Sequence, residues 1–172
     1  IQIEKNLLIQ KKLNMKILGI GNAIVDVICK VDDNFLIQNN LTKSTMKLIF
    51  DEIEFKNLLK TLKIEKTVSG GSVANSIVGL SQLGNQVGFI GKVSDDEFGD
   101  KYEEGLKKEN VEYLYSKKKE ELPTGTCLIL VTPDSERTMC TFLGTAGKIN
   151  ENDVNIKAIE SSEMIFLEGY LW

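Results

Sequence analysis

The chain of 172 residues contains no histidine. Imidazole is the side chain most often used as a general acid or base near neutral pH, and it is a common metal ligand. Its absence excludes a Ser-His-Asp triad, a Cys-His pair and any imidazole-bound metal. A general base in this sequence must therefore be a carboxylate, a lysine or a tyrosine.

Cysteine is scarce, and its three copies, Cys29, Cys127 and Cys140, lie far apart in the sequence. An odd number at such spacing fits neither a disulfide framework nor a zinc site. Two of them lie in apolar alternating runs, where a free cysteine behaves as a small hydrophobic residue. We therefore expect free thiols in a reducing compartment, which places the protein in the cytoplasm.

Long apolar runs and an excess of basic residues are also missing. No stretch approaches the length of a membrane span, and the net charge is −4. The densest basic run, 117–119, is followed at once by Glu120 and Glu121, which predicts a solvated hairpin tip. We expect neither a membrane nor a nucleic acid among the partners.

The two ends of the chain differ from ordinary domain termini. Residues 1–14 lack the profile of a signal peptide, and Met15 directly precedes the first strand-like run. We expect residues 1–14 to be an upstream or non-native extension. The chain stops at Trp172 directly after an apolar run, whereas natural termini usually lie in polar segments. We therefore expect 15–172 to be a partial domain of a truncated chain.

Strand-like and helix-like patterns alternate through the middle of the chain, which is typical of an α/β sheet with parallel strands. The expected strands are 16–21, 86–91 and 164–167, and the expected helices are 51–62, 72–83, 95–109 and 152–159. The β-rich portions 24–50 and 111–142 break this rhythm. We expect them to form a small β layer that projects from the α/β core.

The segment 69–76 is the most informative part of the sequence. Gly70 and Gly71 stand directly before an apolar helical pattern, and Asn75 lies one helical turn in. Bare backbone and free helix N–H groups thus lie beside a side chain with both donor and acceptor atoms. Such a surface suits a ligand rich in hydroxyl groups, because each hydroxyl donates and accepts. The alternative is a tight turn with Asn75 on a solvated face.

Asp26 is an acid inside an otherwise apolar strand-like run. Burying a carboxylate costs several kcal/mol unless it is paired or hydrogen-bonded. Two interpretations stay open: Asp26 faces water on an edge strand, or it accepts hydrogen bonds from two neighbouring hydroxyls of a sugar.

The run Gly19-Ile20-Gly21 begins like a dinucleotide-binding fingerprint. Ile24 stands where the third glycine belongs, and the following residues indicate a strand rather than a helix. A pyrophosphate would then find no helix N-terminus. The phosphate-binding pattern G-x-x-x-x-G-K-[ST] is missing too. The sequence therefore argues against a nicotinamide-dependent oxidoreductase and against a P-loop protein.

Taken in order, these motifs resemble the ribokinase (PfkB) family of carbohydrate and nucleoside kinases. They are Gly19–Asn22 with Asp26, Gly70–Asn75 and Gly88–Gly99, while Leu167–Trp172 most resembles the adenosine-kinase-like branch. The similarity runs from about Lys16 to the last residue. It implies a Rossmann-type α/β sheet flanked by helices, with a β-sheet lid made of the pieces 24–50 and 111–142 and with the C-terminal half missing.

The resemblance also implies roles for individual residues. The substrate-binding set is Asn22, Asp26, Gly70, Gly71, Asn75 and Glu168. In that set Asp26 and Asn75 would bind sugar hydroxyls, which the glycine backbone approaches. Arg137 would stabilise charge on the phosphates; the alternative is a surface arginine paired with Glu136.

In the family, a Gly-Ala-Gly-Asp segment of the second half supplies the catalytic base, and ATP and Mg²⁺ are bound mostly there. Residues 1–172 contain no such segment. The resemblance therefore implies a substrate-binding N-terminal half without a catalytic residue, whose base is expected beyond Trp172.

The reaction that the resemblance implies is ATP-dependent phosphoryl transfer to a hydroxyl of a nucleoside or sugar. Adenosine is the first expected acceptor, and a fructokinase- or ribokinase-type sugar is the second. The alternative is a non-catalytic fragment that binds a sugar or nucleoside weakly. A homodimer formed through the lid is a further expectation.

Overall fold

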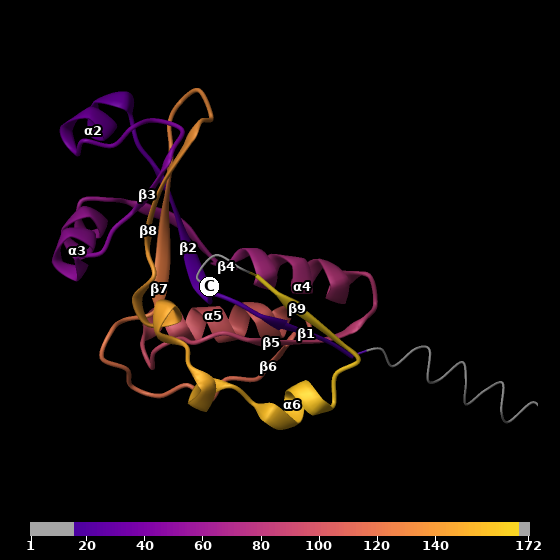
Figure 1. The fold of residues 1–172 in the computed structure, drawn as a ribbon. Coiled ribbons are helices and arrows are strands. Elements are labelled where there is room, and N and C mark those ends of the chain that lie inside the picture. Colours follow the sequence, from indigo (N-terminus) through magenta and orange to yellow (C-terminus); the bar gives the residue numbers. More distant parts are fainter. Residues whose placement is uncertain (1–15, 169–172) are drawn as a thin grey trace, which may run out of the picture.

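Two β-sheets form the framework of the protein (Figure 1). The computed structural model describes them within residues 16–168. The first sheet has four strands, and the second has five and projects away from it. Within residues 16–168, none of the helices has the length and apolar character that a membrane span requires.

The four-stranded sheet is parallel and holds the central core. In spatial order its strands are β6 (Glu112–Tyr113), β5 (Gln86–Ile90), β1 (Lys16–Ile20) and β9 (Met164–Leu167). Both neighbours of β1 run parallel to it. Leu18, Phe89 and Ile90 are fully buried, as short apolar strands covered on both faces require. The expected α/β sheet is thus confirmed.

Helices cover both faces of this sheet (Figure 1). Helices α4 (Ser72–Gln82) and α5 (Glu97–Lys108) pack on one face with Ile17, Val87 and Phe89. Short helix α6 (Ile156–Glu160) packs on the other face, where Ala158 meets Leu18. The apolar spacing along 72–83 and 95–109 therefore predicted both long helices correctly.

The five-stranded sheet forms the β layer that projects from the core. In spatial order its strands are β3 (Met46–Leu48), β8 (Arg137–Phe142), β7 (Gly125–Val131), β2 (Ile24–Lys30) and β4 (Ile64–Gly70). Helices α2 (Asp33–Gln38) and α3 (Glu52–Lys60) accompany it. Phe55 of α3 stacks on Phe142 of β8, with ring centroids 5.3 Å apart.

The observed second sheet differs from the expected lid ranges in two places. Strand β4 belongs to it although 64–70 lies outside both ranges, because this strand mixes charged and apolar residues and carries no clear alternation of its own. Strand β6 belongs to the first sheet, where it pairs with β5. Each of these two strands belongs to the sheet of the strand with which it pairs, and sequence patterns do not reveal that partner.

The prediction of a hairpin tip at 117–119 was wrong. Lys117 is largely buried among Asp95, Asp100 and Glu103, and Lys118 bridges to Ser94 through the backbone. These contacts fix the loop against the start of α5. The hairpin turn lies at 132–136 instead, between β7 and β8.

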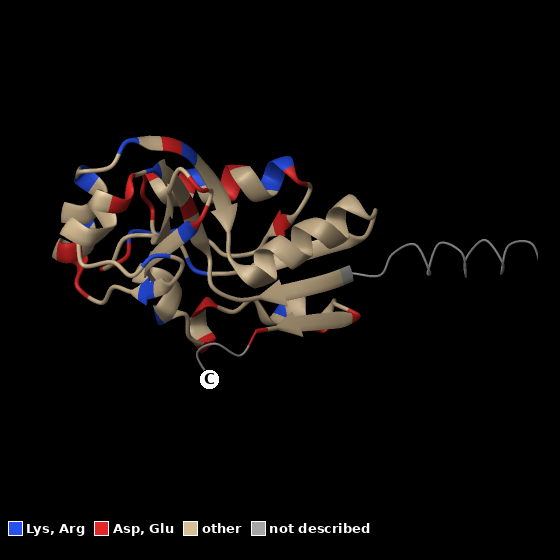
Figure 2. Cartoon of the chain, turned by 90° about the horizontal axis from the view of Figure 1, so that it is seen from above, with Lys and Arg blue, Asp and Glu red and all other residues tan. Residues whose placement is uncertain are grey.

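Charged residues of both signs are interspersed over the surface, and helix α4 carries none (Figure 2). Among the described residues, Lys92 forms two buried ion pairs: its Nζ lies 2.9 Å from Asp153 and 3.4 Å from Glu120. The pair with Asp153 joins the end of β5 to the short 3₁₀ helix η2 (Glu151–Asp153). Cys29, Cys127 and Cys140 are buried free thiols, as expected.

Strand β9 exists where it was expected, but its side chains are not buried. The four residues Met164–Leu167 are 40–52% exposed. Strand β9 lies at an edge of the four-stranded sheet, and no described helix covers it. The prediction of a core strand was therefore right about the conformation and wrong about the burial.

The Gly19-x-Gly21 motif has a packing role. A Cβ atom on Gly19 would lie 2.5 Å from Ile77 Cγ1, and one on Gly21 would lie 2.8 Å from Val73 Cγ2. Both glycines thus let α4 approach β1 closely, and neither begins a helix. The structure supports the decision against a dinucleotide fingerprint.

This packing predicts opposite effects for two glycine-to-alanine changes. Gly19→Ala adds a methyl group where Val73 and Ile77 already fill the space, so the free energy of unfolding should fall by about 1–3 kcal/mol. Gly79→Ala, in α4 with open space around the new methyl, should raise it by about 0.5–1 kcal/mol. Urea unfolding of both variants checks this, and equal effects would contradict the packing role.

Candidate functional site

The candidate site lies where the two sheets meet. Strand β1 ends at Ile20, β2 begins at Ile24, and β4 ends at Gly70 directly before α4. Ligands of open α/β sheets bind at the carboxyl ends of parallel strands. The structure brings Asn22, Asp26 and the Gly70–Gly71 turn together at this position.

Asp26 sits inside the five-stranded sheet and not on its edge. Its strand β2 is flanked by β4 and β7, and Asp26 pairs with Val68 on one side and Cys127 on the other. This pairing removes the edge-strand interpretation. No described residue forms an ion pair or a hydrogen bond with the Asp26 carboxylate. Burial raises its pKa from 3.8 to about 6, since the charged form loses solvation without gaining a partner.

Gly70 is needed because of Asp26. A Cβ atom on Gly70 would lie 2.4 Å from Asp26 Oδ2, so every side chain larger than hydrogen collides with the carboxylate. Gly71 is needed for two reasons: its φ is +98°, and a Cβ atom there would lie 2.3 Å from the Asn22 carbonyl oxygen. The two glycines therefore allow the close approach of the Asp26 carboxylate and the Asn22 carbonyl to the turn, while the predicted approach of a sugar stays a prediction.

Asn75 stands in the first turn of α4 with an exposed side chain. Its backbone N–H donates to the Gly71 carbonyl at 2.9 Å, which fixes the helix start directly after the glycine turn. The Asn75 side chain lies exposed at this end of the helix, and its role toward a ligand stays a prediction.

Glu168 makes contacts within the protein. Its carboxylate accepts hydrogen bonds from the Ser72 hydroxyl and the Val73 backbone N–H. Gly71, which precedes the helix, offers no side chain for this purpose, so Glu168 caps α4 from outside. Burial raises its pKa, and the Val73 hydrogen bond opposes that shift.

The structure places Arg137 apart from these residues. It is the first residue of β8 and pairs with Val131, beside the hairpin turn (Figure 1). Val131 lies four residues beyond Cys127, the partner of Asp26, which is about 13 Å along the strand. Glu136 accepts from Ser44, and Arg137 forms no ion pair within the described part of the chain.

A row of paired residues leads from Asp26 across the sheet. Asp26 pairs with Cys127, Cys127 with Thr141, and Thr141 with Leu48. Directly paired residues present their side chains on the same face. Thr141 donates to Cys127 Sγ at 3.3 Å, and burial raises the pKa of that thiol to about 11.

The sequence could not reveal this row. Alternation along 124–131 and 137–143 indicates which residues share a face within each strand. The register between strands comes from pairing alone.

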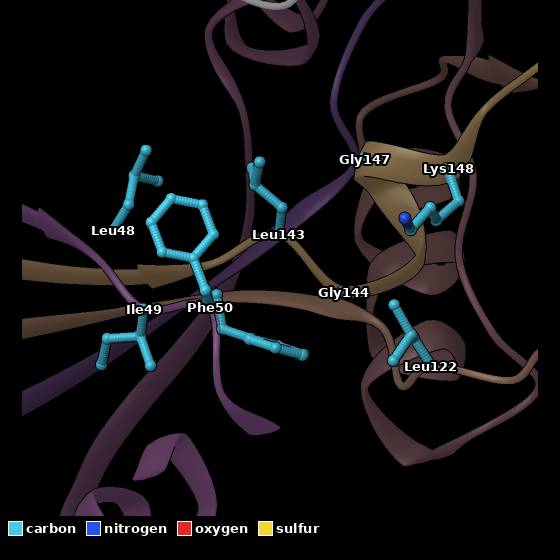
Figure 3. A pocket seen from close by; sticks show the side chains of 9 residues that line it. Leu48, Ile49, Phe50, Leu122, Leu143, Gly144, Gly147 and Lys148 are labelled. Carbon is cyan, nitrogen blue, oxygen red and sulfur yellow. The ribbon is translucent and has the colours of Figure 1, made fainter. Parts of the chain in front are cut away.

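A cavity of about 240 Å³, lined by apolar side chains together with glycine backbone and Lys148, lies at the far end of the row (Figure 3). Leu48 belongs both to the row and to the cavity wall. The residues that line it are Leu48, Ile49, Phe50, Leu122, Phe142, Leu143, Gly144, Gly147 and Lys148. Strand pairing thus places the Asp26 carboxylate at one end of the row and the Leu48 wall of the cavity at the other.

Within residues 16–168, no group of three or more cysteine and acidic side chains is arranged to hold a metal ion. The short acidic run at the start of α5 has a structural role: Asp96 accepts from Gly99 N–H and from the Thr124 backbone and hydroxyl. These hydrogen bonds fix the N-terminus of α5, whose N-cap is Asp96.

Comparison with known proteins places these features in a wider group. A family model described as "pfkB family carbohydrate kinase" matches residues 20–172. A 5-dehydro-2-deoxygluconokinase of Mesomycoplasma hyopneumoniae strain 232 is 28% identical over 122 residues, which are 70% of this chain and 36% of that protein. The same enzyme of Clostridium perfringens strain 13 is 35% identical over 103 residues, which are 58% of this chain and 30% of that protein.

Solved structures agree on the fold. The adenosine kinase of Sinorhizobium meliloti superposes with a TM-score of 0.81 at 34% identity, over 92% of this chain and 48% of that one. The chain therefore spans about a third of the length of these curated relatives and about half of that solved structure.

The raised pKa of Asp26 predicts how the free energy of unfolding depends on pH. The pKa of Asp26 is higher in the folded state than in the unfolded chain, so the folded state holds the proton more tightly. The free energy of unfolding should then fall as the pH rises from about 4 to about 6.

Asp26→Asn should abolish this part of the pH dependence. We expect it to raise the free energy of unfolding by on the order of 2 kcal/mol at about pH 7 and to change it little below about pH 4. Urea unfolding over a pH series measures both. A gain that is the same at both pH values would contradict the raised pKa.

Proposed function

Because the chain belongs to the pfkB family of carbohydrate kinases, we propose that it holds the acceptor-binding part of a kinase. The kinase transfers a phosphoryl group from ATP to a hydroxyl of a nucleoside or a sugar. The observation that carries this proposal is the Asp26 carboxylate, desolvated and without a protein partner, against the Gly70–Gly71 turn. A carboxylate in that state accepts hydrogen bonds from two neighbouring hydroxyls of a ligand.

The acceptor site proposed here consists of Asp26, the Gly70–Gly71 backbone, Asn75 and Asn22. Asp26 accepts from the ligand hydroxyls, and the Asn75 amide donates to and accepts from the same ring. The glycines let the sugar approach the backbone, and Asn22 closes the side of the site next to Gly71. Glu168 acts indirectly, since its carboxylate holds the N-terminus of α4.

In the reaction, ATP would supply the phosphoryl group and Mg²⁺ would offset the charge of its phosphates. We propose that both are bound mostly by a part of the kinase beyond Trp172. Arg137 lies beside the hairpin turn, apart from Asp26, and its role toward the phosphates stays a proposal.

A nucleoside is the acceptor class that the site favours. We expect a ligand with its sugar hydroxyls on Asp26 to extend along the row Cys127, Thr141 and Leu48 toward the cavity and its apolar side chains. A flat ring system gains free energy there by leaving water, whereas a small polyol leaves the cavity unfilled. Adenosine is therefore the first acceptor to test.

A sugar-derived acceptor is the second candidate, and sequence similarity favours it. The curated relatives include kinases named for 5-dehydro-2-deoxygluconate and an Escherichia coli fructokinase, which is 40% identical over 74 residues. We keep three further proposals. The chain could be non-catalytic and only bind such a ligand. It forms a dimer through the five-stranded sheet, and it is located in the cytoplasm.

The first experiment is to read the coding DNA beyond Trp172. An open frame with a Gly-Ala-Gly-Asp-type segment supports the kinase proposal, and the full-length protein is then assayed with ATP and each acceptor: adenosine, ribose, fructose and 5-dehydro-2-deoxygluconate. A stop codon directly after Trp172 would leave ligand binding without phosphoryl transfer. Calorimetry with the same acceptors measures binding in either case.

Asp26→Asn tests the acceptor site. We expect acceptor affinity to fall at least about tenfold near neutral pH, because an amide replaces a charged double acceptor. For the unmodified protein, affinity should fall below about pH 6, where Asp26 gains a proton. The matched control is Asp51→Asn, which keeps the N-cap of α3 and should bind normally. Equal binding by both variants would refute the site.

Leu48→Ser distinguishes the two acceptor classes. Leu48 borders the cavity. The change should therefore lower the affinity for adenosine about fivefold and leave the affinities for ribose and fructose unchanged. Met46→Ser is the matched control, on the same strand and face but outside the cavity. If Leu48→Ser affects sugars and adenosine equally, the cavity does not hold the base.

A further inference from the structure

The hydroxyl of Tyr102 donates a hydrogen bond to the Gly70 carbonyl at 3.2 Å. Tyr102 belongs to α5 and is fully buried. Gly70 is the residue whose missing side chain makes room for the Asp26 carboxylate. A group in the core thus reaches the backbone of the turn that shapes the acceptor site.

The contact between α5 and β4 is reciprocal. Ser69 donates its hydroxyl to the Tyr102 carbonyl at 3.0 Å, while Tyr102 donates its own to the residue after Ser69. A Cβ atom on Gly105 would lie 2.0 Å from Ser69 Oγ, so the helix and the strand are in close contact one turn further along. Each element therefore fixes the backbone of the other.

The ring of Tyr102 is itself held in place by the four-stranded sheet. It packs against Phe89 of β5 and Tyr113 of β6, with ring centroids 6.2 and 5.9 Å apart. A side chain confined on both sides has little freedom to change rotamer. The position of its hydroxyl is thus set by one sheet, while the carbonyl that it holds belongs to the other.

We propose that Tyr102 is a positioning residue for the acceptor site: it fixes the Gly70 carbonyl and thereby the orientation of the Gly70–Gly71 turn relative to Asp26. This role rests on the proposed function. Gly71 has a positive φ of 98°, a region in which glycine moves readily between conformations. A hydrogen bond to the preceding carbonyl restricts rotation of the peptide group that links the two glycines.

The consequence for ligand binding follows from the position of the turn. Asp26 and the start of α4, which carries Asn75, lie on either side of Gly70 and Gly71. Both groups must hold one sugar ring, so a rotation of the turn separates them from their common ligand. Tyr102 is buried, touches no ligand in this arrangement and acts on the turn through the Gly70 carbonyl.

Tyr102→Phe removes the hydroxyl and keeps the ring. The matched control is Tyr115→Phe, because Tyr115 is also buried and donates its hydroxyl at 2.8 Å, but to Glu120. We expect both variants to lose similar thermal stability. Adenosine affinity should fall about fivefold in Tyr102→Phe and stay within about twofold in Tyr115→Phe. In the full-length enzyme the KM for acceptor should rise, with that for ATP unchanged.

A second measurement needs no ligand and separates this inference from the proposed function. In ¹⁵N NMR spectra of the free chain, Tyr102→Phe should shift the amide signals of Gly71 and Ser72, and Tyr115→Phe should not. Absent shifts, or equal losses of affinity in both variants, would overturn the positioning role. Should the unmodified protein bind none of the acceptors, the proposed function fails, and the amide shifts still decide whether Tyr102 fixes the turn.

Discussion

The close approach of two backbone segments at Gly70 and Gly71 governs the arrangement of this protein. The Asn22 carbonyl and the Asp26 carboxylate both occupy space that any side chain on these glycines would fill. Because β2 follows Asn22 and α4 follows Gly71, this contact sets where the five-stranded sheet joins the four-stranded one. Packing of α4 on Gly19 and Gly21 then fixes the same helix from the other side.

The junction also explains why a carboxylate can be kept partly out of water without a partner. Asp26 gains nothing from the protein in return for lost solvation, and its raised pKa records that cost. Side chains whose placement lowers the stability of the fold are typical of functional sites, where a ligand supplies the missing interactions. Lys92 offers the contrast within the same molecule, because its buried charge is satisfied by Asp153 and Glu120 and needs no ligand.

Much of the fold could be predicted from local patterns. Apolar runs located the parallel strands, helical spacing located α4 and α5, and the two glycines with Asn75 located the turn that shapes the site. The errors have a common physical origin. Strand β4 has a mixed sequence whose conformation is stabilised by its pairing with β2, and the basic run at 117–119 is held by acids distant in sequence. The contacts of Glu168 and Tyr102 were hidden too, since each forms between segments that are distant in sequence.

The sequence by itself determined the elements and the chemistry that is possible. Residues 1–172 offer no imidazole, and the glycines, Asp26 and Asn75 indicated a surface for hydroxyl groups. The tertiary structure alone decided which residues meet. It placed Asp26 in the interior of a sheet and aligned Cys127, Thr141 and Leu48 with it. It placed Arg137 beside the hairpin turn, apart from Asp26. The reason is that periodicity specifies the face on which a side chain lies, whereas strand order and register arise from contacts between segments far apart in the chain.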